Sequence, residues 1–271
     1  MKPYMQSDRI VLISQFSWNK EASYVMDSIV EGKKQADVCG NEDDTLIVIW
    51  DRGHCLYVNT KESNTNPDLG LLDQFLHNAI GSEEIRKRLS VMKIYFQNID
   101  ETALLHTLRA YRPTSVERDL YRHKLINPLP PVSLGTEIEI RAIDEETLSR
   151  SGLGNVEAMI EEIEGMWGCS DTFLQHGFGY YAVNEKGDIV NWCTSEYNSN
   201  VSCGIGIESI SEYQGRGIAT ATTTQLVKRC AAARIIPHWD CWSSNIASKK
   251  VAEKTGFEKV LTYKILLIHL V

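Results

Sequence analysis

Three prolines stand within four positions near the middle of the chain, in the run Asn127-Pro128-Leu129-Pro130-Pro131. Proline has no backbone N–H and a fixed φ, so such a run cannot lie inside a helix or a central strand. The run therefore predicts a domain boundary, with an N-terminal domain at 1–127 and a C-terminal domain at 132–271. A chain of 271 residues is long enough for two domains with buried cores.

The N-terminal part mixes helical and strand patterns and contains no motif that predicts a chemical function. Apolar periodicity predicts its elements in the order helix 19–31, strands 45–51 and 55–60, helix 69–80, strand 91–96 and helix 100–111. The first two strands flank Arg52-Gly53, and this turn predicts a hairpin. We therefore expect a smaller N-terminal domain in which helices and strands are mixed.

The C-terminal part has a different order, in which a meander of strands leads into two helix–strand pairs. Its predicted elements are strand 136–141, helices 144–149 and 156–167, strands 178–184, 189–197 and 201–210, helix 217–234, strand 236–242, helix 245–255 and strands 257–261 and 263–271. Short turns join the three middle strands, so these strands are predicted to be antiparallel. The predicted fold class is α+β, with a mixed, mostly antiparallel sheet flanked by helices.

Charge is divided unevenly along an acidic chain. The net charge of −8 argues against a protein that grips a nucleic-acid backbone, because such proteins carry a basic surface. Residues 214–271 nevertheless hold nine basic and three acidic side chains. This cationic end favours a site for an anionic small molecule, although a solvated basic helix face would give the same pattern.

The apolar segments are short, and runs such as 10–13 and 265–268 fall far below the roughly 20 residues that a membrane-spanning helix needs. The N-terminal segment lacks the apolar stretch and cleavage site of a secretory signal. Seven cysteines without a C-x-x-C pair are typical of reduced core residues, with structural zinc or disulfides as alternatives. We expect a cytoplasmic protein with no metal, no membrane partner and no nucleic-acid partner.

The most informative segment is Gln214-Gly215-Arg216-Gly217-Ile218-Ala219, which lies between a predicted strand and a predicted helix. Glycine reaches positive φ and lets the backbone approach a ligand closely. The first turn of a helix has N–H groups without an internal partner, and with the helix dipole they favour a diphosphate. Glycines at such a junction also serve as a plain turn or cap.

Two other phosphate-binding motifs fit this segment less well. A P-loop needs lysine and then serine or threonine after its second glycine, whereas Gly217 is followed by Ile218-Ala219. A dinucleotide-binding fingerprint has a third glycine where this chain has Thr220, and it requires parallel βαβ units. Asp240 does lie near the spacing that such a fingerprint expects, so a dinucleotide-binding oxidoreductase stays open as an alternative function.

The segment resembles the acyl-CoA pyrophosphate loop of the GNAT superfamily of N-acetyltransferases, whose pattern is Arg or Gln, two residues, Gly, one residue, and Gly or Ala. Downstream, Asn245, Ser248 and Gly256-Phe257 have the spacing of the family's second cofactor segment. The order of elements over about 132–271 is similar as well. With its separate N-terminal part, the chain resembles the two-part members of the family that include zwittermicin-type antibiotic-resistance acetyltransferases.

The resemblance implies a GNAT fold for 132–271 and acetyl-CoA as a cosubstrate, with no metal. The end of the strand would pair with the pantetheine arm, the glycine loop would hold the pyrophosphate, and the second segment would contact the cofactor beside it. The implied cofactor residues are Ser209, Ile210, Ser211, Gln214, Gly215, Arg216, Gly217, Ile218, Ala219, Thr220, Asn245 and Ser248. Lys249 and Lys250 would either meet the phosphates or be ordinary solvated helix positions.

Acetyl transfer to an amine needs a group that removes a proton, because an amine is protonated at neutral pH. Glu208, at the end of the strand before the loop, is the implied base, and an outward-facing strand carboxylate is the plain alternative. The family often has a tyrosine acid four residues before Gly256, where this chain has Ala252. The alternative function is therefore a regulatory module that binds acyl-CoA and is catalytically weak.

The acceptor is predicted from charge. Residues 137–171 hold ten acidic and two basic side chains, and in the family this stretch borders the acceptor side. An acidic rim attracts cations, so we expect the substrate to be a primary amine on a small, cationic molecule. A solvated helix face would give the same composition, and self-association as a homodimer is left open.

Overall fold

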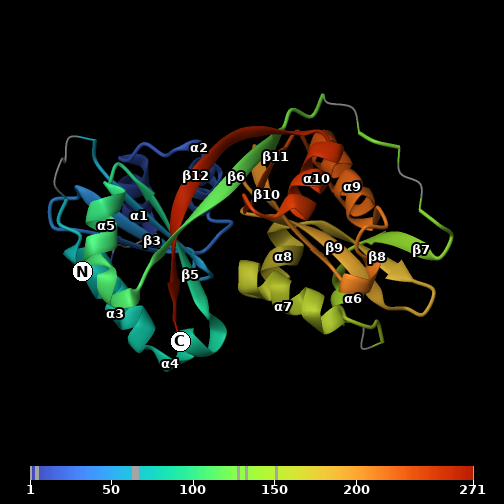
Figure 1. Ribbon diagram of the computed structural model, residues 1–271, viewed down its shortest axis with the longest axis horizontal. Helices are drawn as coiled ribbons and strands as arrows, with labels where there is room; N and C mark the ends of the chain where they lie inside the picture. The colour runs from blue at the N-terminus through green and yellow to red at the C-terminus, as the bar shows by residue number, and fades with distance from the viewer. Residues whose placement is uncertain are drawn as a thin grey trace. The chain divides into compact units, whose positions relative to one another are not determined.

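The computed structural model describes residues 2–3, 6–62, 67–126, 129–131, 134–149 and 152–270. Its contacts divide the chain into two compact units, one made of Met1–Arg118 and Tyr263–Val271 and the other of Asp119–Thr262. The boundaries fall inside strands β6 (Thr114–His123) and β12 (Phe257–His269), so each of these strands gives residues to both units (Figure 1).

The predicted domains 1–127 and 132–271 stay predictions, because residues 127–128 and 132–133 lie outside the described residues. The compact units differ from these ranges at the C-terminus, where the last residues group with the first unit. Leu266 and Ile268 are fully buried in the core of that unit, where β12 pairs antiparallel with β5 (Val91–Gln97). Burial of these apolar side chains explains the grouping.

The first unit has the strand order β1-β2-β3-β4-β5-β12. Its other elements are β1 (Lys2–Pro3), α1 (Gln6–Ser14), α2 (Lys20–Val30), β2 (Asp37–Gly40), β3 (Leu46–Trp50), β4 (Cys55–Thr60), α3 (Gly70–Gly81), α4 (Glu83–Arg88), α5 (Glu101–Thr107) and a 3-10 turn at Arg109–Tyr111. The predicted hairpin is confirmed, since β3 and β4 pair antiparallel around Arg52. The periodicity missed β1, α1, β2, α4 and β6.

The second unit has the strand order β6-β11-β10-β9-β8-β7. Its strands are β7 (Ile138–Ala142), β8 (Gly179–Asn184), β9 (Ile189–Glu196), β10 (Ser202–Ser209) and β11 (Ile236–Trp242). The pairs from β7 to β10 are antiparallel, and β11 lies parallel to β10. The predicted α+β class with a mixed, mostly antiparallel sheet is confirmed, and the meander does not fit a dinucleotide-binding fold.

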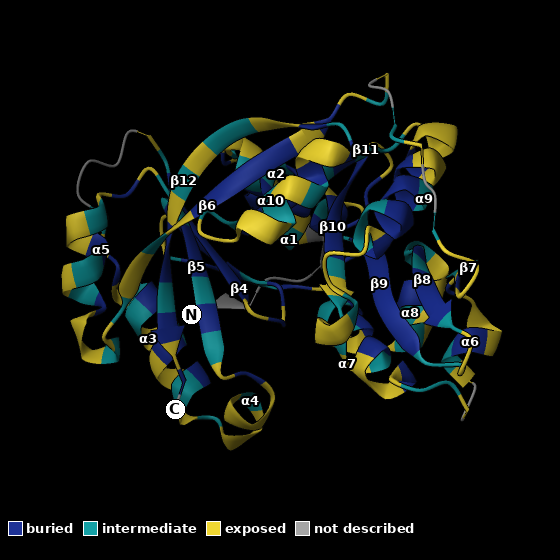
Figure 2. Ribbon diagram, turned by 45° about the vertical axis from the view of Figure 1, so that its right-hand side comes forward, coloured by how far each residue is buried: buried dark blue, intermediate teal, exposed yellow. Residues whose placement is uncertain are grey.

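Helices cover both faces of the sheet in the second unit (Figure 1). They are α6 (Glu145–Ser149), α7 (Val156–Trp167), α8 (Ser170–His176), α9 (Ile218–Ala233) and α10 (Ile246–Lys254). Helices α7 and α8 pack with Trp192 of β9, whereas α9 and α10 pack with the cluster that contains its neighbour Cys193. Because successive strand residues face opposite sides, β9 is covered on both faces, and Figure 2 shows it buried along nearly its whole length.

One sequence prediction was wrong in detail. The strands predicted at 257–261 and 263–271 are replaced by one continuous strand, β12, which passes through Thr262 and ends at His269, because the β-branched Thr262 fits an extended backbone. Helix α8 was not predicted from the sequence.

The structure also bears on the predictions for the cysteines, for membrane-spanning helices and for metal sites. All seven cysteines are free thiols; six are buried, as predicted for core residues, whereas Cys169 is exposed. Over the ranges that the structure describes, no helix is long and apolar enough to cross a bilayer. Over the same ranges, no group of three or more His, Cys, Asp or Glu side chains is placed to hold a metal ion.

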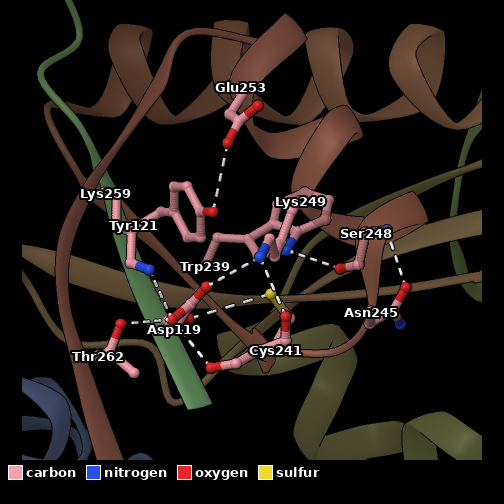
Figure 3. A network of polar contacts seen from close by, with 11 residues as sticks. Asp119, Tyr121, Trp239, Cys241, Asn245, Ser248, Lys249, Glu253, Lys259 and Thr262 are labelled. Carbon is pink, nitrogen blue, oxygen red and sulfur yellow. Dashed lines mark hydrogen bonds and ion pairs between the residues drawn. The ribbon is translucent and has the colours of Figure 1, made fainter. Parts of the chain in front are cut away.

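A buried carboxylate ties several elements of the second unit together. Asp119 on β6 is 1% exposed, and its Oδ1 accepts hydrogen bonds from Thr262 Oγ1 at 2.7 Å and Ser243 Oγ at 2.9 Å and pairs with Lys259 Nζ at 2.8 Å. Lys249 Nζ on α10 lies 3.4 Å from its Oδ2 (Figure 3). Burial raises the pKa of Asp119, but the hydrogen bonds from these four side chains outweigh it and hold the pKa well below its ordinary value.

We expect Asp119→Asn to lower the free energy of unfolding by roughly 2–4 kcal/mol at neutral pH, because the four donors around this buried carboxylate lose its negative charge. The depressed pKa means that this stabilisation is present above the pKa of an unfolded aspartate, about 3.9, and is lost as the pH falls further. Denaturant unfolding at pH 7 and pH 3 measures both effects. An exposed control, Glu185→Gln, should change neither, and an equal loss at both pH values would contradict the account.

Candidate functional site

The parallel strands β10 and β11 are paired only near their beginnings. The register joins Ser202–Gly204 to Ile236–His238, although β10 continues to Ser209 and β11 to Trp242. The rest of β10 remains paired on its other side with β9. Beyond Gly204, the backbone N–H and C=O groups of β10 that face β11 are therefore not used by a strand ladder. This end of the two strands leads directly into α9 and α10.

The loop between β10 and α9 has the backbone shape that its glycines predict. Gly215 has φ 74° and Gly217, the N-cap of α9, has φ 80°. A Cβ placed on either glycine meets no other atom within 4 Å, so the space above the loop is open. The first helical bond of α9 runs from Ala221 N–H to the Gly217 carbonyl, and the N–H groups of 218–220 precede it. These N–H groups and the dipole of a sixteen-residue helix fit a diphosphate.

Arg216 lies at the rim of this loop. Its guanidinium is 4.9 Å from the ring centroid of Tyr213, and its Nη2 pairs with Glu137 Oε1 at 3.2 Å. The Tyr213 hydroxyl accepts a hydrogen bond from Asn184 Nδ2 at 2.9 Å. The two side chains of the ion pair are 43% and 49% exposed, so the pair contributes at most about 1 kcal/mol. A phosphate group, which binds arginine strongly, can displace Glu137.

The second predicted cofactor segment has structural partners. Asn245 caps α10, since its Oδ1 accepts from the Ser248 N–H at 3.0 Å. The Ser248 hydroxyl accepts from Trp239 Nε1 at 3.0 Å. Lys249 Nζ donates to the Ser243 carbonyl at 3.0 Å in addition to its contact with Asp119 (Figure 3). The cofactor roles of Asn245, Ser248 and Lys249 stay predictions, and Lys249 has two partners within the protein.

The predicted base Glu208 lies near a second carboxylate that the sequence did not indicate. Glu208 is exposed near the end of β10, and Trp192 of β9 stands directly opposite it in the register. The Trp192 indole Nε1 donates to Glu162 Oε2 of α7 at 2.7 Å. Burial raises the pKa of Glu162, the Trp192 hydrogen bond lowers it, and the charge of Glu208 raises it further. Among the described residues, no lysine or arginine is ion-paired with Glu162 or Glu208.

Strand β11 and Ala252 both contribute to the core of the second unit. Burial alternates along β11, with Trp239 buried in the core and His238 on the same face as its register partner Gly204. Burial, and then the charge of Arg122, lowers the pKa of His238 to about 4, so this imidazole is neutral at physiological pH. Ala252, at the position of the family's tyrosine, is fully buried and packs in the same core cluster as Trp239.

Sequence reasoning missed Asn191 and Glu162, whose importance depends on contacts between elements far apart in the chain. Asn191 on β9 donates to the Glu208 carbonyl and to Ser209 Oγ. One signal was present in the sequence: an amide in the middle of an apolar strand pattern, which is rare unless its hydrogen bonds are satisfied.

The second unit thus defines a class of α+β protein in which a parallel strand pair separates beside an open glycine loop at a helix N-terminus. Residues 72–266 match the family model described as GNAT acetyltransferase. The chain belongs to this family.

Relatives and solved structures agree with this assignment. An uncharacterized N-acetyltransferase of Bacillus subtilis, YdfB, is 32% identical over 126 residues, which is 46% of this chain and 46% of that protein, so the match spans about half of the relative's length. A GCN5-related N-acetyltransferase-like protein from Streptococcus suis has a TM-score of 0.68 at 17% identity over 97% of this chain and 99% of its own. A GCN5-related N-acetyltransferase from Sphaerobacter thermophilus gives 0.57 at 17% identity over 99% and 95%. These two structures show the same fold.

Proposed function

We propose that the chain is an acetyl-CoA-dependent N-acetyltransferase that acts on a primary amine of a small, cationic molecule. The observation that carries this proposal is the continuity of one segment: β10 presents Glu208 near its end and leads into the open glycine loop at the N-terminus of α9. A loop that would bind the phosphates and a carboxylate that would act as the base then belong to the same strand–helix junction.

The loop residues fit the diphosphate of acetyl-CoA, which when bound supplies the thioester-activated acetyl group. The N–H groups of 218–220 and the helix dipole would hold the pyrophosphate, and Arg216 would exchange Glu137 for a phosphate oxygen. The backbone of Ser209–Ser211, next to the edge of β10 that β11 does not pair with, would hold the pantetheine arm. Asn245 and Ser248, in the first turn of α10, would lie beside it.

The acceptor ammonium would be held and deprotonated at the carboxylates. Glu208 is exposed and would take the proton from the amine nitrogen, which makes the nitrogen a nucleophile. Glu162 would add a second negative charge on the other side of the Trp192 indole, and two uncompensated carboxylates favour a cation. Two other acids of 137–171 are ion-paired: Glu137 pairs with Arg216, and Glu139 pairs with Arg141. The basic Arg150 lies outside the described residues.

Release of free thiol from acetyl-CoA in the presence of a panel of amines tests the proposed function. The panel should contain polyamines and aminated antibiotics, because the two-part architecture resembles zwittermicin-type resistance enzymes. A second candidate, an acyl-CoA-binding regulatory module, is favoured by the buried Ala252 in place of a tyrosine acid. Tight acetyl-CoA binding without thiol release for any amine would favour that module. The seven free cysteines support a reducing compartment, and we propose the cytoplasm.

We expect kcat/KM for a polycationic amine to exceed that for a neutral amine of similar size by roughly tenfold or more at low salt, and this preference should shrink as ionic strength rises. The physical reason is attraction of the cation by Glu162 and Glu208, which salt screens. Initial rates at two salt concentrations measure the effect. A preference that is absent at low salt, or that does not change with salt, would remove the cationic acceptor from the proposal.

A further inference from the structure

Asn191 is a fully buried amide whose hydrogen bonds reach the end of β10 and helix α9, on either side of the glycine loop. Its Nδ2 donates to the Glu208 carbonyl oxygen at 2.5 Å and to Ser209 Oγ at 2.9 Å. Its Oδ1 accepts from Thr222 Oγ1 of α9 at 2.5 Å. One side chain on β9 therefore joins the end of β10 to the beginning of α9.

Thr222 is the partner of Asn191 on α9, directly after the first turn of the helix. It is also fully buried, and its hydroxyl lies 3.2 Å from the Ala219 carbonyl and 3.4 Å from the Ile218 carbonyl. A hydroxyl has a single proton, and the nearest of its acceptors is Asn191 Oδ1. The connection thus runs from the Glu208 carbonyl through Asn191 to Thr222, beside the turn whose N–H groups are proposed to hold the diphosphate.

A buried amide is costly unless its hydrogen bonds are made, as they are for Asn191. Val190 and Cys193, one and two positions from Asn191 along β9, are fully buried apolar residues, so this part of the strand also accepts apolar side chains. The side-chain bonds of Asn191 go to β10 and α9 at the proposed site. By contrast, the buried amide Asn198 donates to the His176 carbonyl and to Ser195 Oγ, beyond the opposite end of β9.

We propose that Asn191 is a positioning residue for the reaction. It fixes the end of β10, which carries Glu208, relative to the glycine loop at the N-terminus of α9. This inference rests on the proposed function. Displacement of reacting groups by about 1 Å can cost 10²-fold in rate, so a buried side chain that sets their spacing affects catalysis without touching substrate.

Three variants test the proposal. Asn191→Leu, which removes both links, should lower kcat roughly 10–100-fold and raise the Kd of acetyl-CoA about tenfold. Thr222→Val, which removes only the link to α9, should raise the Kd and leave kcat at saturating acetyl-CoA within about threefold. The control Asn198→Leu should lower the melting temperature and leave kcat and Kd unchanged. Calorimetry, initial rates and thermal unfolding give these quantities.

The proposal is overturned if Asn191→Leu behaves like Asn198→Leu, with a lower melting temperature and unchanged kcat and Kd. If Asn191→Leu does not fold, an unchanged Kd in Thr222→Val overturns the α9 link. Amide hydrogen exchange separates these outcomes from failure of the proposed function. If the wild-type chain transfers no acetyl group, faster exchange confined to 208–211 and 218–222 in Asn191→Leu still supports positioning, and unchanged exchange there contradicts it.

Discussion

Gly217→Val should reduce acetyl-CoA binding by more than 100-fold while the second unit stays folded. The N–H groups of 218–220 bind a diphosphate only if its oxygens approach the backbone closely, and a valine side chain at the N-cap of α9 would occupy that space. No protein atom lies within 4 Å of the added Cβ, so the loss would come from exclusion of the ligand and not from a clash inside the protein.

The positive φ of Gly217 makes a control necessary, because valine at φ 80° is strained by roughly 1–3 kcal/mol wherever it stands. Gly187, in the turn between β8 and β9, has φ 86° and equally open surroundings. Gly187→Val should therefore show a similar fall in melting temperature with unchanged acetyl-CoA affinity. Calorimetry with circular dichroism distinguishes the two variants, and a Gly217→Val protein that still binds within threefold of wild type would remove the loop from the cofactor site.

The fold of the second unit could be predicted from sequence because its signals are local. Alternation along β8, β9 and β10 with short turns predicts a meander, and Gly215 and Gly217 adopt the positive φ that only glycine reaches easily. The pairing of β10 with β11 follows from the helix between them, since a strand–helix–strand unit in one sheet is parallel.

The contacts that organise the site depend on long-range packing and leave little trace in the sequence. Glu162 is one of many acids on a helix face, and only the arrival of Trp192 from β9 distinguishes it. Asp119 collects donors from residues more than 120 positions away in the chain. The sequence at the end of β12 has an ordinary strand pattern. Its pairing with β5 determines that it is buried in the core of the first unit. Hydrophobic periodicity predicts which face of a strand or helix is buried, but it does not predict the element against which that face packs.

Glu208→Gln should lower kcat by ~10²–10⁴-fold near neutral pH and change the Kd of acetyl-CoA by less than about threefold. Glutamine has nearly the same size as glutamate and still forms hydrogen bonds. It cannot take the proton from the substrate ammonium, so the nucleophilic amine would not form. The cofactor contacts proposed for 209–220 involve backbone groups and side chains other than Glu208, so binding should persist. Single-turnover acetyl transfer and calorimetry measure the two quantities.

Two matched variants decide what a loss of activity in Glu208→Gln means. Glu212→Gln changes an exposed glutamate in the turn after β10 and should leave kcat unaltered. It is the control for the general effect of removing one negative charge near the loop. Glu162→Gln removes the half-buried carboxylate and should mainly raise the KM of a cationic amine. If Glu208→Gln loses less than tenfold while Glu162→Gln loses more, the proton goes to Glu162, whose pKa is raised by burial.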